Sequence, residues 1–272
     1  MIAGVGLIGG SIAAALRKRM PACRITGVGR SRTRLEQACA QGLIDDFSTT
    51  PCSALSSTSI VVICLPVEHI AESVIEFVKH LNSDCVITDG GSVKGAIYED
   101  LRRKGGPSLQ FVGAHPIAGS EQSGFENADP DLYEGRTCVI TPEGARPDLV
   151  ARVTQFWGSI GCRTVEMTAS EHDQVLALTS HLPHVMASVT AACVQPQHLP
   201  LTGTGFRDTT RVAAGAADLW AGILLGNQRF VVEAMLRAEQ VLQELRLAVE
   251  SRDSVRIEAI LHRAAVLRQM LD

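Results

Sequence analysis

Two glycine-rich segments in the middle of the chain carry side chains that could move a proton. Ser92 lies in "DGGSVKGAI" and His115 lies in "GAHPIAGSEQSGF", and a short apolar run precedes each segment. Pro116 biases the backbone of His115 towards extended conformations and so restricts where the imidazole ring points. A neutral imidazole held in this way can accept a proton from a hydroxyl group. The pattern predicts His115 as a catalytic base, with Ser92 fixing its tautomer or binding the same hydroxyl. The simpler alternative is a structural His–Pro turn.

A glycine motif typical of dinucleotide binding opens the chain. The segment "MIAGVGLIGGS" has the pattern G-x-G-x-x-G between a strand-like run and a helical run. Glycines at these positions permit a tight turn and a close approach to a pyrophosphate, and the helix N-terminus offers free N–H groups. The alternative is an ordinary glycine-rich turn. The predicted cofactor-binding residues in this loop and in the loop after the third strand-like run are Gly4, Gly6, Leu7, Ile8, Gly9, Leu65 and Pro66.

The end of the second strand-like run, "ITGVGRSRTRL", bears on the choice of cofactor. NAD-binding proteins commonly place Asp or Glu about 20 residues after the glycines, where the carboxylate binds the ribose hydroxyls. Gly29 occupies that position here, and Arg30, Ser31 and Arg32 follow it. No carboxylate repels a 2′-phosphate, and guanidinium groups can bind one through two hydrogen bonds. The sequence therefore predicts NADP in preference to NAD, the alternative being a solvated basic start of a helix.

The elements that must position these residues follow a simple alternation. Short β-rich runs alternate with helical patterns up to about residue 168, and beyond it only helical patterns remain. Alternating strands and helices imply a mostly parallel sheet, and ligands of such sheets bind beyond the carboxyl ends of the strands. Ser92 and His115 should therefore share one crevice. We expect an α/β fold with a Rossmann-like dinucleotide-binding domain at 1–168 and an all-helical domain at 169–272.

The helical part carries wide apolar stripes over residues 219–249 and 254–271. In a monomer such stripes would leave large apolar patches exposed to water. Two-fold dimers are the commonest closed assembly of soluble proteins. We therefore expect a homodimer formed through the helical domain.

Composition excludes several classes of protein. A net charge of −4 and a pI of about 6.1 argue against a nucleic-acid partner. No apolar run in the sequence has the length of a membrane span, and no signal peptide opens the chain, so we expect no membrane partner and a cytoplasmic location. Eight scattered cysteines without a C-x-x-C pair argue against a disulfide framework. His181 and His184, with His172 and Asp173 upstream, lack the further Cys or Glu of a metal site, so no metal is expected.

Six segments together resemble one enzyme family. They are "GLIGGS", "DGGSVK", "HPIAGSEQSG", "EHDQVLALTSHLPH", "GFRDTTRVA" and "LWAGILLGN". In this order and spacing they resemble the prephenate/arogenate dehydrogenase family of tyrosine biosynthesis, over almost the whole chain. The resemblance implies a Rossmann-like domain followed by a helical domain for substrate binding and dimerisation. It also implies an NAD(P)-dependent oxidative decarboxylation of prephenate or arogenate, to 4-hydroxyphenylpyruvate or tyrosine. Hydride leaves the hydroxyl-bearing ring carbon, and the ring carboxylate leaves as CO2.

The resemblance also implies roles for single residues. His115 would polarise or deprotonate the ring hydroxyl, with Ser92 beside it, and Arg211 would bind the ring carboxylate. An arginine suits that role independently, because its planar fork matches a carboxylate. The alternative for the arginines near residue 210 is surface ion pairing, which contributes little. The further substrate-binding residues expected are His184, His181, Glu121 and Arg207.

Two other functions compete with this interpretation. A β-hydroxyacid or ketopantoate-type NADP oxidoreductase has a similar domain order but relies on a lysine–asparagine pair in its helical domain. This chain has no lysine beyond Lys104. A catalytically inactive nucleotide-sensing regulator would bind the cofactor without turnover, yet a sensor needs no base such as His115. The choice between prephenate and arogenate stays open.

Overall fold

The computed structural model describes residues 1–50, 58–104, 110–119 and 122–271. The chain forms two compact units, Met1–Asn227 and Gln228–Asp272. The first unit includes several helices beyond residue 168, because α6 (Ala169–Leu176) packs on α4 (Gly95–Arg103) and α9 (Ala217–Gly226) packs on α3 (Val67–Val78). The domain boundary expected between 168 and 169 stays a prediction.

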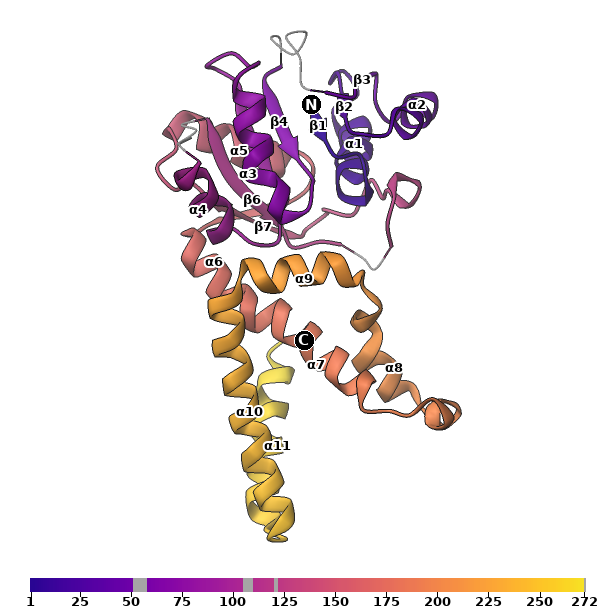
Figure 1. Ribbon diagram of the computed structural model, residues 1–272, viewed down its shortest axis with the longest axis vertical. Coiled ribbons are helices and arrows are strands. Elements are labelled where there is room, and N and C mark those ends of the chain that lie inside the picture. Colours follow the sequence, from indigo (N-terminus) through magenta and orange to yellow (C-terminus); the bar gives the residue numbers. More distant parts are fainter. Residues whose placement is uncertain (51–57, 105–109, 120–121, 272) are drawn as a thin grey trace. The chain divides into compact units, whose positions relative to one another are not determined.

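A single sheet organises the first unit (Figure 1). Within the described ranges its strand order is β3-β2-β1-β4-β5-β6-β7-β8. The strands from β3 to β6 are parallel, β7 runs antiparallel to β6, and β8 is parallel to β7. This confirms the expected α/β fold with a mostly parallel sheet. The strands are β1 (Ile2–Ala3), β2 (Thr26–Val28), β3 (Asp46–Ser48), β4 (Ile60–Ile63), β5 (Val86–Asp89), β6 (Phe111–Pro116), β7 (Thr137–Thr141) and β8 (Arg163–Glu166).

Helices cover both faces of this sheet, and each face has its own apolar core. One core joins the sheet to α1, α2 and α5, and it centres on the fully buried Trp157. The other joins the sheet to α3 and α4 and also takes in Ala169 and Ile223 from the later helices. Burial on both faces explains why the central strands read as continuous apolar runs. The helices not yet bounded are α1 (Leu7–Arg19), α2 (Arg32–Ala40) and α5 (Pro147–Ser159).

A continuous helical segment, Ala169–Ala192, follows the sheet. Thr168 and Glu171 form a capping box that fixes where α6 begins. The segment then passes through a π-helical turn, Ala177–His181, into α7 (Leu182–Ala192). Pro183 lies in the first turn of α7, directly after the π-helical turn, where its missing N–H breaks no helical hydrogen bond.

By length and a mean hydropathy of 1.2, the segment Ala169–Ala192 is the one helix within the described ranges that could cross a membrane. The core helices of soluble proteins meet the same criteria. This segment also buries polar side chains, His172, Asp173, His181 and His184, among protein neighbours. The remaining helices of the first unit are α8 (Thr204–Thr210) and α9, with short 3₁₀ turns at Phe125–Asn127, Pro196–Leu201 and Arg211–Ala214.

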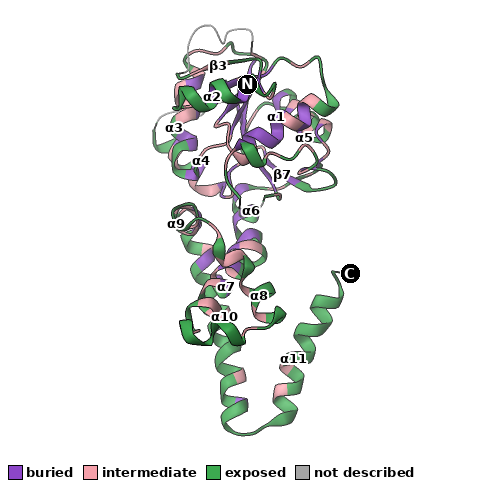
Figure 2. Cartoon of the chain, turned by 90° about the vertical axis from the view of Figure 1, so that its right-hand side faces the viewer, coloured by how far each residue is buried: buried purple, intermediate pink, exposed green. Residues whose placement is uncertain are grey.

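The second unit is a helical hairpin. It consists of α10 (Gln228–Glu250) and α11 (Ser254–Gln269), joined by a short turn in which Arg252 has a φ of 56°. The helical run expected at 219–249 is thus two helices, because α9 ends at Gly226 with Asn227 as its C-cap. Most residues of the hairpin are exposed (Figure 2).

Candidate active site

The glycine motif lies where the strand order reverses. β1 and β4 are neighbours in the sheet although the chain visits β2 and β3 between them, and such switch points bind ligands. Gly4 has a φ of 93°, and a side chain there would clash with the carbonyl of Cys64 at the end of β4. A side chain at Gly9 would clash with the carbonyl of Gly4. Both glycines are therefore required for close packing, as the motif predicts.

The remaining glycine leaves space for a ligand. Nothing lies within 4 Å of the position that a Cβ on Gly6 would occupy. Gly6 is also the N-cap of α1, which has no side-chain cap and no acidic residue in its first turn. The first helical hydrogen bond runs from Gly10 N to Gly6 O at 2.8 Å, so the N–H groups of Leu7, Ile8 and Gly9 stay available. The loop fits a dinucleotide pyrophosphate, and Leu65 and Pro66 lie on the adjoining loop between β4 and α3.

The three residues after β2 that were predicted to bind the cofactor, Arg30, Ser31 and Arg32, differ in the contacts that their side chains make. Arg32 contacts Glu36 at 2.8 Å and stacks over the Phe47 ring at 5.5 Å. Ser31 is the N-cap of α2. Arg30 is exposed and forms no ion pair with any residue that the structure describes. Of the two predicted arginines, Arg30 is therefore the one whose guanidinium is available to an anion.

A buried ion pair separates β6 from β5 just before His115. Paired residues of the two strands end at Thr88 and Val112. Beyond them Asp89 accepts a hydrogen bond from Ala114 N at 2.9 Å, and Lys94 Nζ donates to Ala114 O at 2.9 Å and contacts Asp89. Lys94 and Asp89 are fully buried. The pair satisfies the backbone where the ladder stops, so β6 can turn towards β7 and carry His115 into the site.

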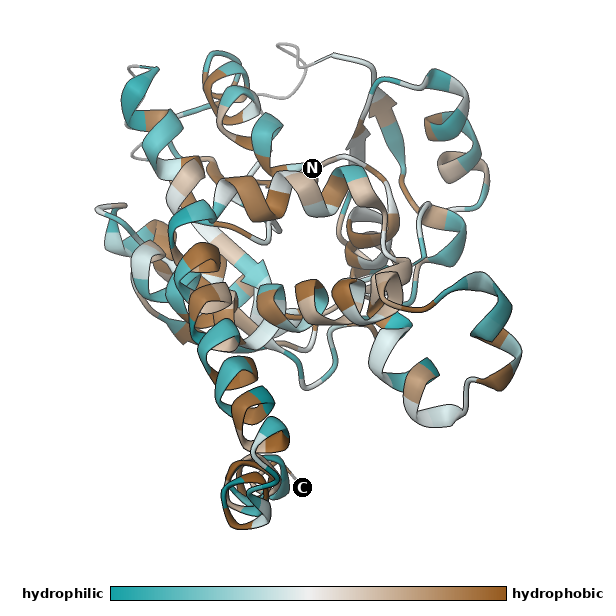
Figure 3. Ribbon diagram, turned by 60° about the horizontal axis from the view of Figure 1, so that its bottom comes forward, coloured by the Kyte–Doolittle hydropathy of each residue, from teal (hydrophilic) through white to brown (hydrophobic). Residues whose placement is uncertain are grey.

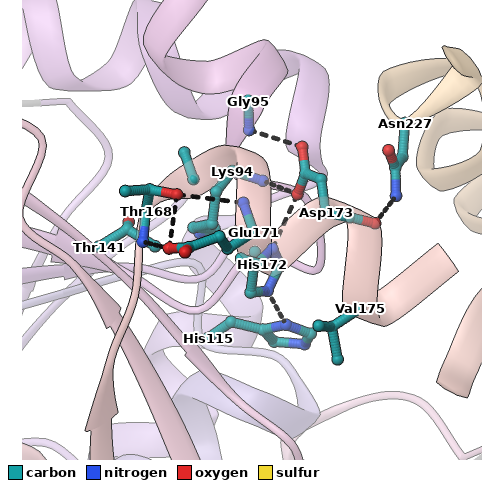
Figure 4. A network of polar contacts seen from close by, with 12 residues as sticks. Lys94, Gly95, His115, Thr141, Thr168, Glu171, His172, Asp173, Val175 and Asn227 are labelled. Atoms are coloured by element: carbon teal, nitrogen blue, oxygen red, sulfur yellow. Dashed lines mark hydrogen bonds and ion pairs between the residues drawn. The ribbon is translucent and has the colours of Figure 1, made fainter. Parts of the chain in front are cut away.

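His115 belongs to a chain of hydrogen bonds that reaches α6 (Figure 4). Its Nδ1 lies 2.8 Å from His172 Nε2, and His172 Nδ1 lies 2.7 Å from Asp173 Oδ1. The Asp173 carboxylate also accepts the backbone N–H groups of Lys94 and Gly95, at 2.9 and 2.8 Å. These two amides form the N-terminus of α4, which favours a negative charge. The network thus links β6, α4 and α6.

A second arm continues from the same carboxylate residue. Asn227 Nδ2 donates to the backbone carbonyl of Asp173 at 2.7 Å and lies 3.2 Å from His181 Nδ1. One turn further along α7, the His184 ring stacks on Trp220 of α9, with centroids 3.5 Å apart and planes at 10°. Among the described side chains, His181 Nε2 and His184 Nδ1 are buried without a hydrogen-bond partner. A buried nitrogen without a partner is costly, and a ligand that bonded these atoms would remove that cost.

Burial keeps these histidines neutral. It lowers the pKa of His115 well below its usual value, and the neighbouring His172 and Lys94 lower it further. Burial also lowers the pKa of His172, which the hydrogen bond to Asp173 partly opposes, and that of His184. The pKa of His181 falls to about 4 for the same reason. At neutral pH all four imidazoles are therefore uncharged.

The predicted site residues occupy different places. His115, His181 and His184 lie in the network and its second arm. The backbone of Ser92 lies close enough to the His181 ring to affect its pKa, but no hydrogen bond joins the Ser92 side chain to His115 within the described residues. Glu121 lies outside the described residues.

The two predicted arginines lie on the segment after α7. Arg207 is exposed on α8, and Arg211 is exposed at the start of the 3₁₀ turn Arg211–Ala214, which packs against α7. The residue after it, Val212, has its backbone at the His184 ring. Arg211 is therefore next in sequence to a residue that touches the second arm.

The sequence did not predict several residues of the hydrogen-bond network. Their positions in quoted motifs were visible, since Asp89 and Lys94 lie in "DGGSVK" and the pair at 172–173 lies in "EHDQ", but no local pattern assigned them a partner. In the part of the chain that the structure describes, no three His, Cys, Asp or Glu residues are grouped as metal ligands. The residues of the network that the sequence analysis did not assign to the site are Asp89, Lys94, His172, Asp173, Trp220 and Asn227.

Comparison with known proteins agrees with this geometry. The family described as "Prephenate dehydrogenase, nucleotide-binding domain" matches residues 12–166, and "Prephenate dehydrogenase, dimerization domain" matches residues 168–263. The glycine motif lies before the first matched residue and so rests on the geometry described above. The chain is similar to the prephenate dehydrogenase of Bacillus subtilis (strain 168), with 33% identity over 266 residues, covering 93% of this chain and 71% of that protein.

Two solved structures extend the similarity. The prephenate dehydrogenase from A. aeolicus, in complex with hydroxyphenyl propionate and NAD+, is 31% identical with a TM-score of 0.90, covering 100% of this chain and 97% of that one. The Synechocystis arogenate dehydrogenase is 28% identical with a TM-score of 0.83, covering 100% and 99%. These matches confirm the resemblance seen in the sequence motifs. The chain belongs to the prephenate dehydrogenase family of NAD(P)-dependent oxidoreductases.

Proposed function

We propose that this enzyme oxidatively decarboxylates prephenate, arogenate or both, to 4-hydroxyphenylpyruvate or tyrosine. The observation that carries the proposal is the buried, neutral His115, whose Nδ1 is held by His172 while its other ring nitrogen is left for a substrate. The relatives described above include one named for prephenate and one named for arogenate. The nicotinamide cofactor, when bound, supplies the acceptor for hydride.

His115 acts in the reaction as the proton acceptor. The substrate O–H bond breaks and an N–H bond forms at Nε2 of His115, while the C–H electron pair of the same carbon leaves as hydride. The bond to the ring carboxylate then breaks, CO2 departs, its electrons complete the aromatic ring, and the ring oxygen takes back the proton from Nε2 of His115. Ser92, in the bend between β5 and α4, lies beside this region as a second contact for the hydroxyl. Burial of the base keeps it neutral and ready at physiological pH.

The second arm holds the carboxylates of the substrate. Because Asn227 Nδ2 can only donate, His181 Nδ1 must accept, which leaves the proton of that imidazole on Nε2. This buried N–H is a donor suited to a carboxylate. His184 lines the same arm against Trp220. Arg211 is proposed to bind the ring carboxylate through its planar fork, and Arg207 and Glu121 are proposed as further substrate-binding residues.

The preference for NADP is a finer proposal. Arg30 is available to a 2′-phosphate, and no carboxylate stands at Gly29. A Cβ at Gly29 would meet only Leu35, at 3.7 Å or more, so Gly29→Asp fits without a clash. We expect this change, and Arg30→Ala separately, to lower kcat/KM for NADP+ relative to NAD+. Arg32→Ala is the matched control, because Arg32 is already bound to Glu36. Wild-type enzyme with equal or greater kcat/KM for NAD+ would overturn the assignment.

A homodimer is proposed through the helical region. The chain matches a dimerisation domain over residues 168–263, and apolar residues are exposed along the hairpin near the C-terminus (Figure 3). Light scattering at micromolar concentration should give twice the mass of the chain, and a monomer would contradict the proposal. A cytoplasmic location stays a prediction, which cell fractionation tests. The exposed large apolar residues of α10 and of the segment from α11 onward are Val232, Met235, Leu236, Val241, Leu242, Leu247, Val249, Val255, Leu261, Val266, Leu267, Met270 and Leu271.

The decisive test is a steady-state assay of both substrates crossed with both cofactors. We expect reduced cofactor and CO2 in equal amounts from at least one pair. The pair with the highest kcat/KM assigns substrate and cofactor preference. Cofactor binding without turnover of either substrate would instead support the nucleotide-sensing regulator and overturn the proposed reaction.

A further inference from the structure

Two adjacent residues of α6, His172 and Asp173, connect His115 to the N-terminus of α4 (Figure 4). We propose that they are positioning residues that fix His115 in the tautomer with its proton on Nδ1, so that Nε2 remains the proton acceptor. The inference rests on the proposed function for its catalytic meaning. The tautomer itself is a property of the free protein.

The carboxylate of Asp173 accepts three N–H groups. Two are the backbone amides of Lys94 and Gly95, and the third is Nδ1 of His172 at 2.7 Å. An ionised carboxylate is only an acceptor, so each of these contacts needs a hydrogen on nitrogen. His172 must therefore carry its proton on Nδ1. The N-terminus of α4 stabilises the negative charge of the Asp173 carboxylate, and the proton assignment for His172 depends on that charge.

The next step follows from the neutrality of His172. Burial lowers its pKa, so at neutral pH the ring carries one proton, and that proton is on Nδ1. Nε2 of His172 then has a free electron pair and can only accept. His115 Nδ1, 2.8 Å away, must donate, and the single proton of neutral His115 is thereby placed on Nδ1. Nε2 of His115 is left unprotonated.

The same chain bears on the charge that appears during the reaction. A protonated His115 would lie near Lys94, which opposes a positive charge there. Lys94 is itself neutralised by the buried Asp89. The carboxylate of Asp173, connected through His172, is the remaining negative group in the network and offsets the new charge. A buried carboxylate of this kind stabilises the imidazolium that forms when the base accepts a proton, and it does so without exposing the base to water.

A purely structural role must be separated from this one. Asp173 also caps α4, so a change at that residue would disturb folding as well as the tautomer. His172 offers a cleaner test, because two substitutions differ in a single property. His172→Gln can place its amide oxygen near the former Nε2 and still accept from His115, whereas His172→Leu has no acceptor.

The kinetic test compares these two variants in the full-length enzyme with wild type. We expect His172→Leu to lower kcat about 10²-fold or more, the usual span for a mispositioned acid–base group. We expect His172→Gln to stay within about tenfold of wild type, since one neutral hydrogen bond replaces another. Cofactor affinity, measured by fluorescence titration, should be unchanged in both. Equal losses in the two variants, or no loss in His172→Leu, would overturn the proposal. His80→Leu, a change on the surface of the same unit, is the control.

The direct test needs no turnover. In free wild-type protein labelled with ¹⁵N-histidine, the His115 signals, assigned by their loss in His115→Asn, should show a protonated Nδ1 and an unprotonated Nε2. The His172→Leu variant should show a mixture of tautomers, and His172→Gln should keep the wild-type pattern. A wild-type His115 protonated on Nε2 would refute the inference. If the enzyme turned over neither substrate, the proposed function would fail while this measurement still decided the tautomer.

Discussion

The two arms of the histidine cluster are built in opposite ways. Along the first arm, His115 Nδ1 and both nitrogens of His172 have hydrogen-bond partners. Along the second arm, His181 Nε2 and His184 Nδ1 are buried without one in the described structure. Satisfied groups are rigid and keep one protonation pattern, whereas unsatisfied buried groups cost stability until a ligand arrives. This difference supports the proposal that the first arm handles a proton and the second binds the substrate.

The tautomers of His115 in the first arm and His181 in the second arm also differ. The hydrogen-bond chain leaves His115 with an unprotonated Nε2, an acceptor, while Asn227 leaves His181 with a protonated Nε2, a donor. Identical side chains thus acquire opposite roles from their neighbours. Substitutions in each arm should therefore affect different kinetic parameters.

The largest effect is expected in the first arm. His115→Asn removes the proton acceptor, so kcat should fall by about 10²–10⁴. Cofactor affinity should change much less than kcat, because the loop proposed to bind the pyrophosphate belongs to the β1–α1 turn and not to β6. Steady-state kinetics with the preferred substrate measure the loss, with the surface change His80→Asn as control. A kcat close to wild type would remove His115 as the base and end the contrast between the arms.

Acid should destabilise the protein through the buried histidines of both arms, whose pKa values burial lowers, and the share of His181 in the second arm is tested here. The pKa of His181 is about 4 when folded and near its ordinary 6.5 when unfolded, so the unfolded chain binds a proton first as pH falls. Stability from this residue is complete above pH 6.5 and is lost as pH falls to about 4, by about 3 kcal/mol. Urea unfolding at pH 7 and pH 4.5 measures the change. His181→Leu should flatten this dependence, and an unchanged slope in that variant would contradict the assignment.

A smaller effect is expected where the second arm meets the substrate carboxylate. Arg211→Lys keeps the charge but loses the planar fork, so KM should rise about tenfold or more with kcat little changed. Arg246→Lys, a change at an exposed arginine of α10 that contacts Glu250, is the matched comparison. If KM for Arg211→Lys equals that of wild type, Arg211 does not bind the substrate.

The smallest effect is expected from a change that keeps the stacking in the second arm. His184→Phe preserves a ring against Trp220 and removes a buried nitrogen that has no partner within the described residues. Unfolding free energy should stay within about 1 kcal/mol of wild type, while KM rises about tenfold. His172→Phe should instead lose about 1–3 kcal/mol, since it leaves the partners of His172 unpaired. Equal losses of stability would show that the two arms are alike.

The amino-acid sequence by itself determined the fold class, the glycine motif and the identity of His115 as the base to test. These features are local: a strand, a turn and a helix within a few residues, or a histidine beside a proline. The family resemblance also followed from short motifs in order, and the comparisons confirmed it. The sequence motifs pointed to His181, His184 and Arg211 through that resemblance.

Only the tertiary structure decided how these residues act. His115 and His172 are 57 residues apart, and Lys94 and Asp173 are 79 residues apart, yet each pair is in hydrogen-bond contact. Such contacts depend on how the crossovers bring β6, α4 and α6 together, and no periodicity or spacing encodes them. The tautomer of each imidazole depends in turn on those contacts, because a neutral ring has one proton and its neighbours choose the nitrogen that holds it.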